Sequence, residues 1–216
     1  MRIRITHQRI TIVLQLILLA EAVFAVIGQR WFTAFLTSMI IAITFFPVLF
    51  ERRFRIHIPP GLQLAAIGFV FASLFLGEIR DYYTRFWWWD MALHTTSGFL
   101  LGILGFLLVH IMNETEKLQM HLKPGFVALF AFMFALGIGA LWEVFEFTMD
   151  SLFGMNMQKP MLGDPSGLTD TMWDLIVDAI GALIISTLGW HYLKNPDEAS
   201  FLERWIDAFI ERNPRF

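Results

Sequence analysis

Residues 124–150 read PGFVALFAFMFALGIGALWEVFEFTMD, a long apolar run whose end carries three acids, Glu143, Glu146 and Asp150. A helix of about 20 mostly apolar residues is long enough to cross a bilayer. Positions i, i+3 and i+7 share one face of a helix, so the three carboxylates would form a stripe along one side of this span. Ionisable residues inside a membrane are rare and costly, so the stripe indicates a functional site.

The composition of the whole chain indicates the same class of protein. Of its 216 residues, 56% are hydrophobic and 16% are charged, with 23 Phe and 8 Trp. A soluble domain of this size would need more polar residues to cover its surface. The net charge of −3 argues against a nucleic-acid partner, and the absence of cysteine excludes disulfides and thiolate metal sites. The expected partner is the lipid bilayer, and the sequence makes no prediction of oligomeric state.

Five other segments are similarly long and apolar, which predicts an all-α polytopic membrane protein with a six-span transmembrane helix bundle over residues 1–194. The predicted spans are 10–28, 32–50, 61–79, 90–110, 124–149 and 171–191. The tail, residues 195–216, has Phe201, Trp205, Ala208 and Phe209 at spacings of three and four. That pattern is typical of an amphipathic helix on a membrane surface.

The distribution of Lys and Arg predicts the orientation. With six spans, both termini and the second and fourth loops face one side, which holds twelve of the 16 basic residues. They are Arg2, Arg4, Arg9, Arg52, Arg53, Arg55, Lys117, Lys123, Lys194, Arg204, Arg212 and Arg215. The opposite side holds Arg30, Arg80, Arg85 and Lys159. Because basic loops stay in the cytoplasm, both termini are predicted to be cytoplasmic.

This topology brings three polar stripes to the outer leaflet. The fourth span starts with Asp90 and His94 at i, i+4, and Ser97 continues their face. The sixth starts with three acids at i, i+4, i+8, and glycines in the fourth and fifth spans would let the helices approach closely. The candidate site residues are Asp90, His94, Glu143, Glu146, Asp150, Asp170, Asp174 and Asp178.

So many acids need a counter-charge. Neighbouring buried carboxylates disfavour each other's charged form, and the nearby bases Arg80, Arg85 and Lys159 all lie in loops. Either several acids are protonated or a divalent metal cation lies among them. Carboxylates with an imidazole suit Zn, Mn or Fe, whereas carboxylates alone suit Mg, Ca or Mn. A simpler interpretation keeps His94 as a hydrogen-bonded interior residue and Asp170 as a helix N-cap.

The connection between the fifth and sixth spans, residues 151–169, is the longest outside the spans. It is rich in Gly, Pro and Met, and it joins two acid-bearing helices directly above the predicted cluster. Long loops in compact proteins are often lids or binding loops. We therefore expect either a lid, from which Asp164 would reach down to the site, or a disordered connector.

Three motifs carry a family resemblance. Residues 89–98 (WDMALHTTSG), 141–146 (LWEVFE) and 167–176 (GLTDTMWDLI) occur in an order that resembles the YjdF-like bacterial inner-membrane proteins. The resemblance covers the last four spans, from about Phe69 to His191. It implies a bacterial inner-membrane location and a membrane fold. No biochemical activity is agreed for that family, so it implies none here.

Three functional hypotheses follow. The first is a metal-dependent hydrolase or transferase that acts at the periplasmic face on a lipid-linked substrate or other small molecule, with Asp90 orienting His94. The second is an ion or metal transporter or sensor that uses the acids as a cation or proton site. The third is a non-catalytic structural membrane protein. The pattern names no catalytic nucleophile or general base, so whether the protein is an enzyme stays open.

Overall fold

The computed structural model describes residues 2–114, 122–194, 205, 208–209 and 211–213. These residues are helical, with turns and one isolated bridge between Met161 and Asp164. Six helical stretches among them are long and apolar enough to cross a membrane. They are His7–Ile27, Trp31–Arg53, Pro60–Ile79, Trp89–Val109, Pro124–Phe153 and Leu168–Lys194. The prediction of an all-α, six-span membrane protein is confirmed.

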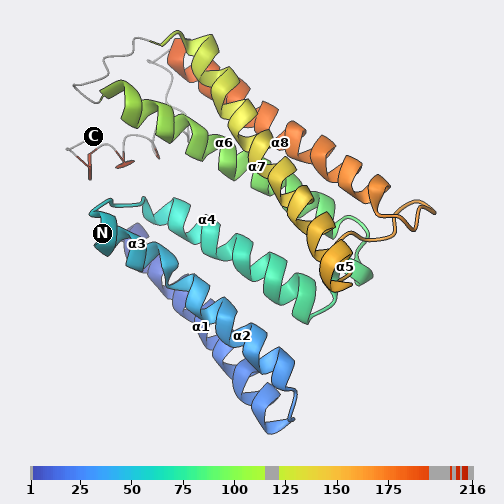
Figure 1. Ribbon diagram of the computed structural model, residues 1–216. Helices are drawn as coiled ribbons and strands as arrows, with labels where there is room; N and C mark the ends of the chain where they lie inside the picture. The colour runs from blue at the N-terminus through green and yellow to red at the C-terminus, as the bar shows by residue number, and fades with distance from the viewer. Residues whose placement is uncertain (1, 115–121, 195–204, 206–207, 210, 214–216) are drawn as a thin grey trace. The chain divides into compact units, whose positions relative to one another are not determined.

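The chain divides into two compact units, which are described separately. The first holds Met1–Trp89 with Trp205–Arg215, and the second holds Asp90–Arg204 with Phe216. Figure 1 labels their helices along the chain. All eight candidate site residues belong to the second unit.

In the first unit, helix α1 (Arg2–Ile27) lies along α2 (Trp31–Thr44). The turn between them places Gln29 in the left-handed region, at φ 55°. The second span is interrupted, because α3 (Phe46–Phe54) starts afresh with Pro47 in its first turn. Proline lacks the amide hydrogen that an uninterrupted helix would donate and clashes with the preceding turn.

The third span changes its helical pitch midway. Helix α4 (Pro60–Val70) continues directly into a π-helical segment, η1 (Phe71–Ile79), and the short helix α5 (Tyr82–Arg85) follows. Phe75 of η1 packs with Leu18 and Ile40 in the core of this unit. Long π-helical stretches are rare, and η1 is the π-helical segment among the described spans.

The predicted amphipathic tail, residues 195–216, lies mostly outside the described residues. Of the described positions, Trp205 packs its indole ring over Gly61 at the start of α4. The Asn213 side chain accepts a hydrogen bond from the backbone N–H of His57 (2.6 Å) and donates to the His57 carbonyl (2.8 Å). The end of the chain is thus tied to the connection between the second and third spans.

The second unit consists of α6 (Trp89–Glu114), α7 (Pro124–Phe153) and α8 (Leu168–Lys194). Helices α7 and α8 lie side by side (Figure 1). Pro124 in the first turn of α7 and left-handed Gly154 after its last residue set the limits of that helix. The unit's core includes Phe106, Val109, Val127 and Ala131.

Two glycines bring α6 and α8 into backbone contact. A Cβ on Gly98 of α6 would overlap the carbonyl oxygen of Asp178. A Cβ on Gly181 of α8 would likewise overlap the carbonyl oxygen of Thr95. Small residues permit this approach between membrane helices. The contact lies at the level of the acidic residues and therefore sets how far apart their side chains are.

We expect Gly181→Ala to destabilise the protein, because its methyl group must displace the α6 backbone. Overpacking of this kind costs about 1–3 kcal/mol. Gly137→Ala is the matched control, since a Cβ there meets no atom within 4 Å. It should leave stability unchanged or raise it by roughly 0.5–1 kcal/mol, because Ala favours helices over Gly. Thermal unfolding of both variants in detergent is the measurement, and equal midpoints would contradict the close approach.

Candidate metal centre

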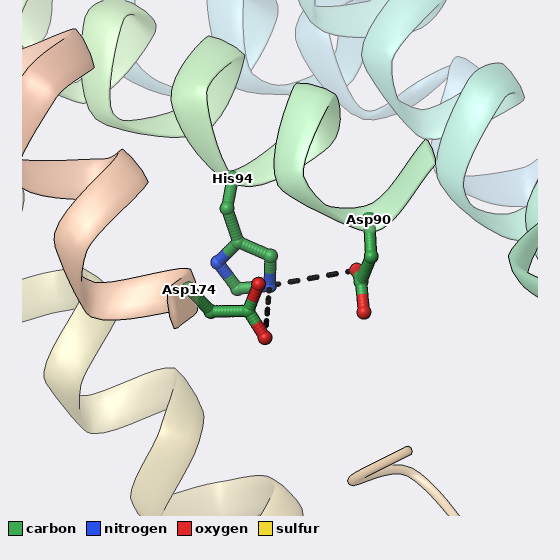
Figure 2. Close-up of side chains that lie close together, drawn as sticks. All are labelled: Asp90, His94 and Asp174. Carbon is green, nitrogen blue, oxygen red and sulfur yellow. Dashed lines mark ion pairs between the residues drawn. The ribbon is translucent and has the colours of Figure 1, made fainter. Parts of the chain in front are cut away.

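His94 lies at the centre of a cluster of carboxylates contributed by all three helices of the second unit. Its Nε2 atom is 3.7 Å from Asp90 Oδ1, 3.8 Å from Glu143 Oε1 and 3.9 Å from Asp174 Oδ2. Figure 2 shows His94 and Asp90 projecting from neighbouring turns of α6, with Asp174 reaching the imidazole from α8. One nitrogen therefore faces oxygens from three helices.

These distances are too long for hydrogen bonds, which need about 2.7–3.2 Å between nitrogen and oxygen. They lie within the range of ion pairs with a protonated imidazole, and they are also close to the separations between ligands of one ion. Two ligand atoms bonded at about 2.1 Å in a tetrahedral arrangement lie roughly 3.4 Å apart. Donor atoms of Asp90, His94 and Asp174 all fall within 4.8 Å of one another. The three distances between His94 Nε2 and the carboxylate oxygens exceed that separation by roughly 0.3–0.5 Å.

Glu143 carries the clearest sign of a missing counter-charge. Its residue is only 4% exposed, and both carboxylate oxygens are buried without a hydrogen-bond partner. An isolated buried carboxylate is strongly disfavoured unless it is paired or coordinates a metal. One of these oxygens, Oε1, points at His94 Nε2. Glu143 thus has an ion-pair contact with His94 and no hydrogen bond to either carboxylate oxygen.

Asp178 lies on the other side of the imidazole and is fully satisfied. Its Oδ2 is 3.2 Å from His94 Nδ1, and its Oδ1 accepts a hydrogen bond from the Ser97 hydroxyl at 2.6 Å. The side chain is completely buried. Asp178 thus contacts the ring nitrogen opposite to the one that faces the other three carboxylates.

The remaining three candidate acids have different partners. Glu146 accepts a hydrogen bond from the Trp142 indole, one turn earlier on the same helix (2.9 Å). Asp150 accepts the backbone N–H groups of Met157 and Gln158, at 2.7 and 2.9 Å. Asp170, which is buried, accepts the backbone N–H of Lys159 at 2.6 Å. Asp150 and Asp170 hold the connection between α7 and α8.

Asp164, expected to reach the site if the connection were a lid, instead fixes the start of α8. It accepts hydrogen bonds from the backbone N–H of Ser166 and from both the N–H and the hydroxyl of Thr169. Hydrogen bonds from Ser166 and Thr169 lower the pKa of Asp164 below its usual range. The capping contact expected of Asp170 is thus made by Asp164, with Asp170 bonded to Lys159.

Glu21, an acid within the first span, belongs to the first unit. It is buried and forms ion pairs with Arg30 (3.1 Å) and Arg80 (2.6 Å). Arg80, counted from sequence among the bases near the cluster, therefore has a carboxylate partner in its own unit. No local sequence pattern predicts this pairing, because Glu21 and Arg80 are 59 positions apart.

The charged Asp164 carboxylate should stabilise the first turn of α8 down to acidic pH. A group whose folded pKa is depressed contributes stability above its unfolded pKa, and the contribution is lost as pH falls through the folded value. The Thr169 amide should stay protected from hydrogen exchange between pH 7 and pH 5, after correction for the intrinsic rate. Asp164→Ala should remove that protection. Equal protection in the variant would contradict the role assigned to Asp164.

Comparisons with known proteins agree with this description. Residues 10–195 match the family described as "Predicted membrane protein (DUF2238)". A Thermotoga maritima protein, described as uncharacterised, is 30% identical over 145 residues, which cover 67% of this chain and 69% of that protein. No solved structure matches. The expected membership of a membrane family without an assigned activity is confirmed, and the match includes the first two spans as well as the last four. The chain belongs to the DUF2238 family of predicted membrane proteins.

Proposed function

We propose that this protein binds a divalent metal cation within the membrane through His94 Nε2 and the carboxylates of Asp90, Glu143 and Asp174. The observation that carries the proposal is the buried carboxylate of Glu143. Neither of its oxygens has a hydrogen-bond partner, and one lies 3.8 Å from the imidazole nitrogen that Asp90 and Asp174 also approach. A divalent cation between these four groups would offset two of the three carboxylate charges.

The donor set favours a transition metal. Imidazole nitrogen suits Zn, Mn and Fe, whereas Mg²⁺ is usually bound through carboxylates, phosphates and retained water. One histidine with three carboxylates from three different helices gives four protein donors. Zn²⁺, Mn²⁺ and Fe²⁺ are therefore preferred to Mg²⁺ at this centre.

The location that we propose is the outer leaflet of the bacterial inner membrane. Basic residues are concentrated on the side of both termini, which places those termini in the cytoplasm. The hydrogen bonds between Asn213 and His57 support a shared side for the chain's end and the second loop. The acids lie near the opposite ends of their helices, and the site then opens toward the periplasm.

Of the functions compatible with such a centre, we favour a metal-dependent hydrolase or transferase. A bound divalent cation supplies Lewis-acid polarisation of a phosphoryl or carbonyl oxygen and activation of water. Glu143 lies ten residues before the end of α7, on the order of 15 Å along a helix axis. A substrate reaching that depth would carry a lipid portion, which is why we propose a lipid-linked substrate.

The composition of the helices inward of the cluster counts against a transporter. Inward of the cluster, residues 99–109 of α6 and 124–138 of α7 contain no polar or charged side chain. In α8, Ser186 and Thr187 are the only polar residues of the stretch from 179 to 190. A path for a cation across the membrane would need polar groups on the inner half. A centre that opens on one side fits an enzyme or a stabilising ion site better.

We expect purified protein reconstituted with Zn²⁺ or Mn²⁺ to bind the metal stoichiometrically. Glu143→Gln and Asp174→Asn should each reduce the affinity strongly, because each removes one charged ligand. The measurement is elemental analysis after dialysis, combined with calorimetric titration. Unfolding temperature should rise with metal in the wild type, since a ligand that binds only the folded state stabilises it.

Glu146→Gln is the matched control for Glu143→Gln. It makes the same change of acid to amide one turn away on α7, at a residue whose carboxylate bonds to Trp142. This variant should keep its metal. The four-ligand centre is contradicted if the wild type binds no metal. It is also contradicted if Glu143→Gln and Glu146→Gln lose the metal equally.

Measurements of catalysis and of ion flux distinguish the three hypotheses of an enzyme, a transporter and a structural protein. Wild-type protein loaded with metal should hydrolyse or transfer a group of a lipid-linked phosphate or ester in a substrate screen, and Glu143→Gln should not. The same two proteins in liposomes should show no metal or proton flux. Flux in the wild type that the Glu143 variant lacks would favour the transporter instead, and metal binding without either activity would favour the structural role.

A further inference from the structure

Asp178 differs from the other acids of the cluster in how completely it is fixed. Its carboxylate accepts from Ser97 on one oxygen and lies against His94 Nδ1 on the other. Gly139 of α7 forms the wall behind it, because a Cβ there would overlap Asp178 Oδ2. Gly98 meets its backbone in the same way. The carboxylate therefore has one position, set by side chains and backbone of all three helices.

The position of Asp178 determines which imidazole nitrogen can bind a metal. A carboxylate only accepts hydrogen bonds, so the nitrogen that it contacts must carry a hydrogen. A histidine with its proton on Nδ1 presents an unprotonated Nε2 when the ring is neutral. That second nitrogen is the one facing Asp90, Glu143 and Asp174.

We propose that Asp178 is a positioning residue, which with Ser97 holds His94 in the tautomer whose Nε2 is free to bind the metal. The inference rests on the metal centre proposed above and assigns Asp178 a role distinct from that of the ligands. Metal-binding histidines commonly donate their other N–H to a carboxylate, which fixes the ring and makes the ligating nitrogen more basic.

The packing explains why Asp178 suits this role and Asp90 does not. Asp90 is partly exposed, lies on the same helix as His94 and approaches Nε2. Asp178 is fully buried, comes from another helix and contacts Nδ1. A residue that orients the ring through Nδ1 leaves Nε2 to the ligands, whereas a residue on the Nε2 side competes for the same nitrogen.

The test uses the full-length protein labelled with ¹⁵N-histidine and loaded with Zn²⁺, which is diamagnetic. Two-bond ¹⁵N–¹H spectra should show His94 with a proton on Nδ1 and the metal on Nε2, and the signal is assigned by its loss in His94→Gln. The Nδ1 proton should resonate far downfield because its acceptor is a carboxylate. In Asp178→Asn this proton should move upfield, and Zn²⁺ affinity should fall about 10- to 100-fold.

Two further variants complete the design. Ser97→Ala keeps the Asp178 carboxylate and removes one bond to it, so it should keep the Nδ1 proton and lose less affinity than Asp178→Asn. Ser97→Ala also tests the positioning role if the Asp178→Asn protein does not fold. Asp164→Asn, an equal change of acid to amide in the connection before α8, should alter neither the spectrum nor the affinity.

The two proposals fail in different ways. Wild-type protein that binds no Zn²⁺ overturns the metal centre and, with it, the role of Asp178. Zinc bound through Nδ1 overturns the positioning role alone, because the centre then exists with the opposite tautomer. The positioning role also fails if the Asp178→Asn and Ser97→Ala proteins match the wild type in both spectrum and affinity.

Discussion

The contact between the backbones of α6 and α8 is the constraint on which the site depends. Gly98 and Gly181 allow each helix to meet a carbonyl oxygen of the other without an intervening side chain. Without this approach, Asp178 would not lie within 3.2 Å of His94 Nδ1, and Asp174 would be further from Nε2. Interhelical contact through small residues, which in membranes replaces the hydrophobic driving force, here also sets the spacing of the charged groups.

The acids of the second unit have two kinds of polar partner. Asp150, Asp164 and Asp170 accept backbone N–H groups of the connection between α7 and α8. A carboxylate can accept several such hydrogen bonds while it stays charged. Their oxygens are engaged in holding the connection in place. Deeper in the helices there are no free backbone amides to donate, because each is bonded within its own helix, so the acids there contact side chains instead: Glu146 contacts Trp142, and Glu143 and Asp178 contact His94.

Much of the fold follows from the sequence, because its determinants are local. Length and apolar character predict six spans, and the described residues contain six helical stretches at those places. The interruption of the second span at Pro47 and the π-helical segment after Val70 were not predicted. Proline inside an apolar run ends a helix in one context and kinks it in another, and a π-helix depends on packing around it.

The convergence of the polar stripes could also be predicted, since helical spacing and topology bring them to one side. The partner of each acid could not be predicted from the sequence. A stripe at i, i+4, i+8 makes Asp170, Asp174 and Asp178 look equivalent, yet they face a backbone amide, the Nε2 side and the Nδ1 side of His94 respectively. The difference arises from helix rotation and from the path of the connection, which spacing within one helix does not contain.

The asymmetry around His94 bears on the kind of chemistry that the unit can support. On the Nδ1 side, every polar atom named here has a partner and glycines close the packing. On the Nε2 side, Asp90 is partly exposed and Glu143 has oxygens without partners. The Nδ1 side is closely packed, whereas the Nε2 side has carboxylate oxygens without hydrogen-bond partners, so a further polar group or ion would be bound on the Nε2 side. His94, Glu143 and Asp174 are themselves buried, so the partly exposed Asp90 is the member of this side that lies nearest to the surroundings of the helices. The two nitrogens of one imidazole thus face differently packed surroundings, and this difference comes from which helix supplies each neighbouring acid.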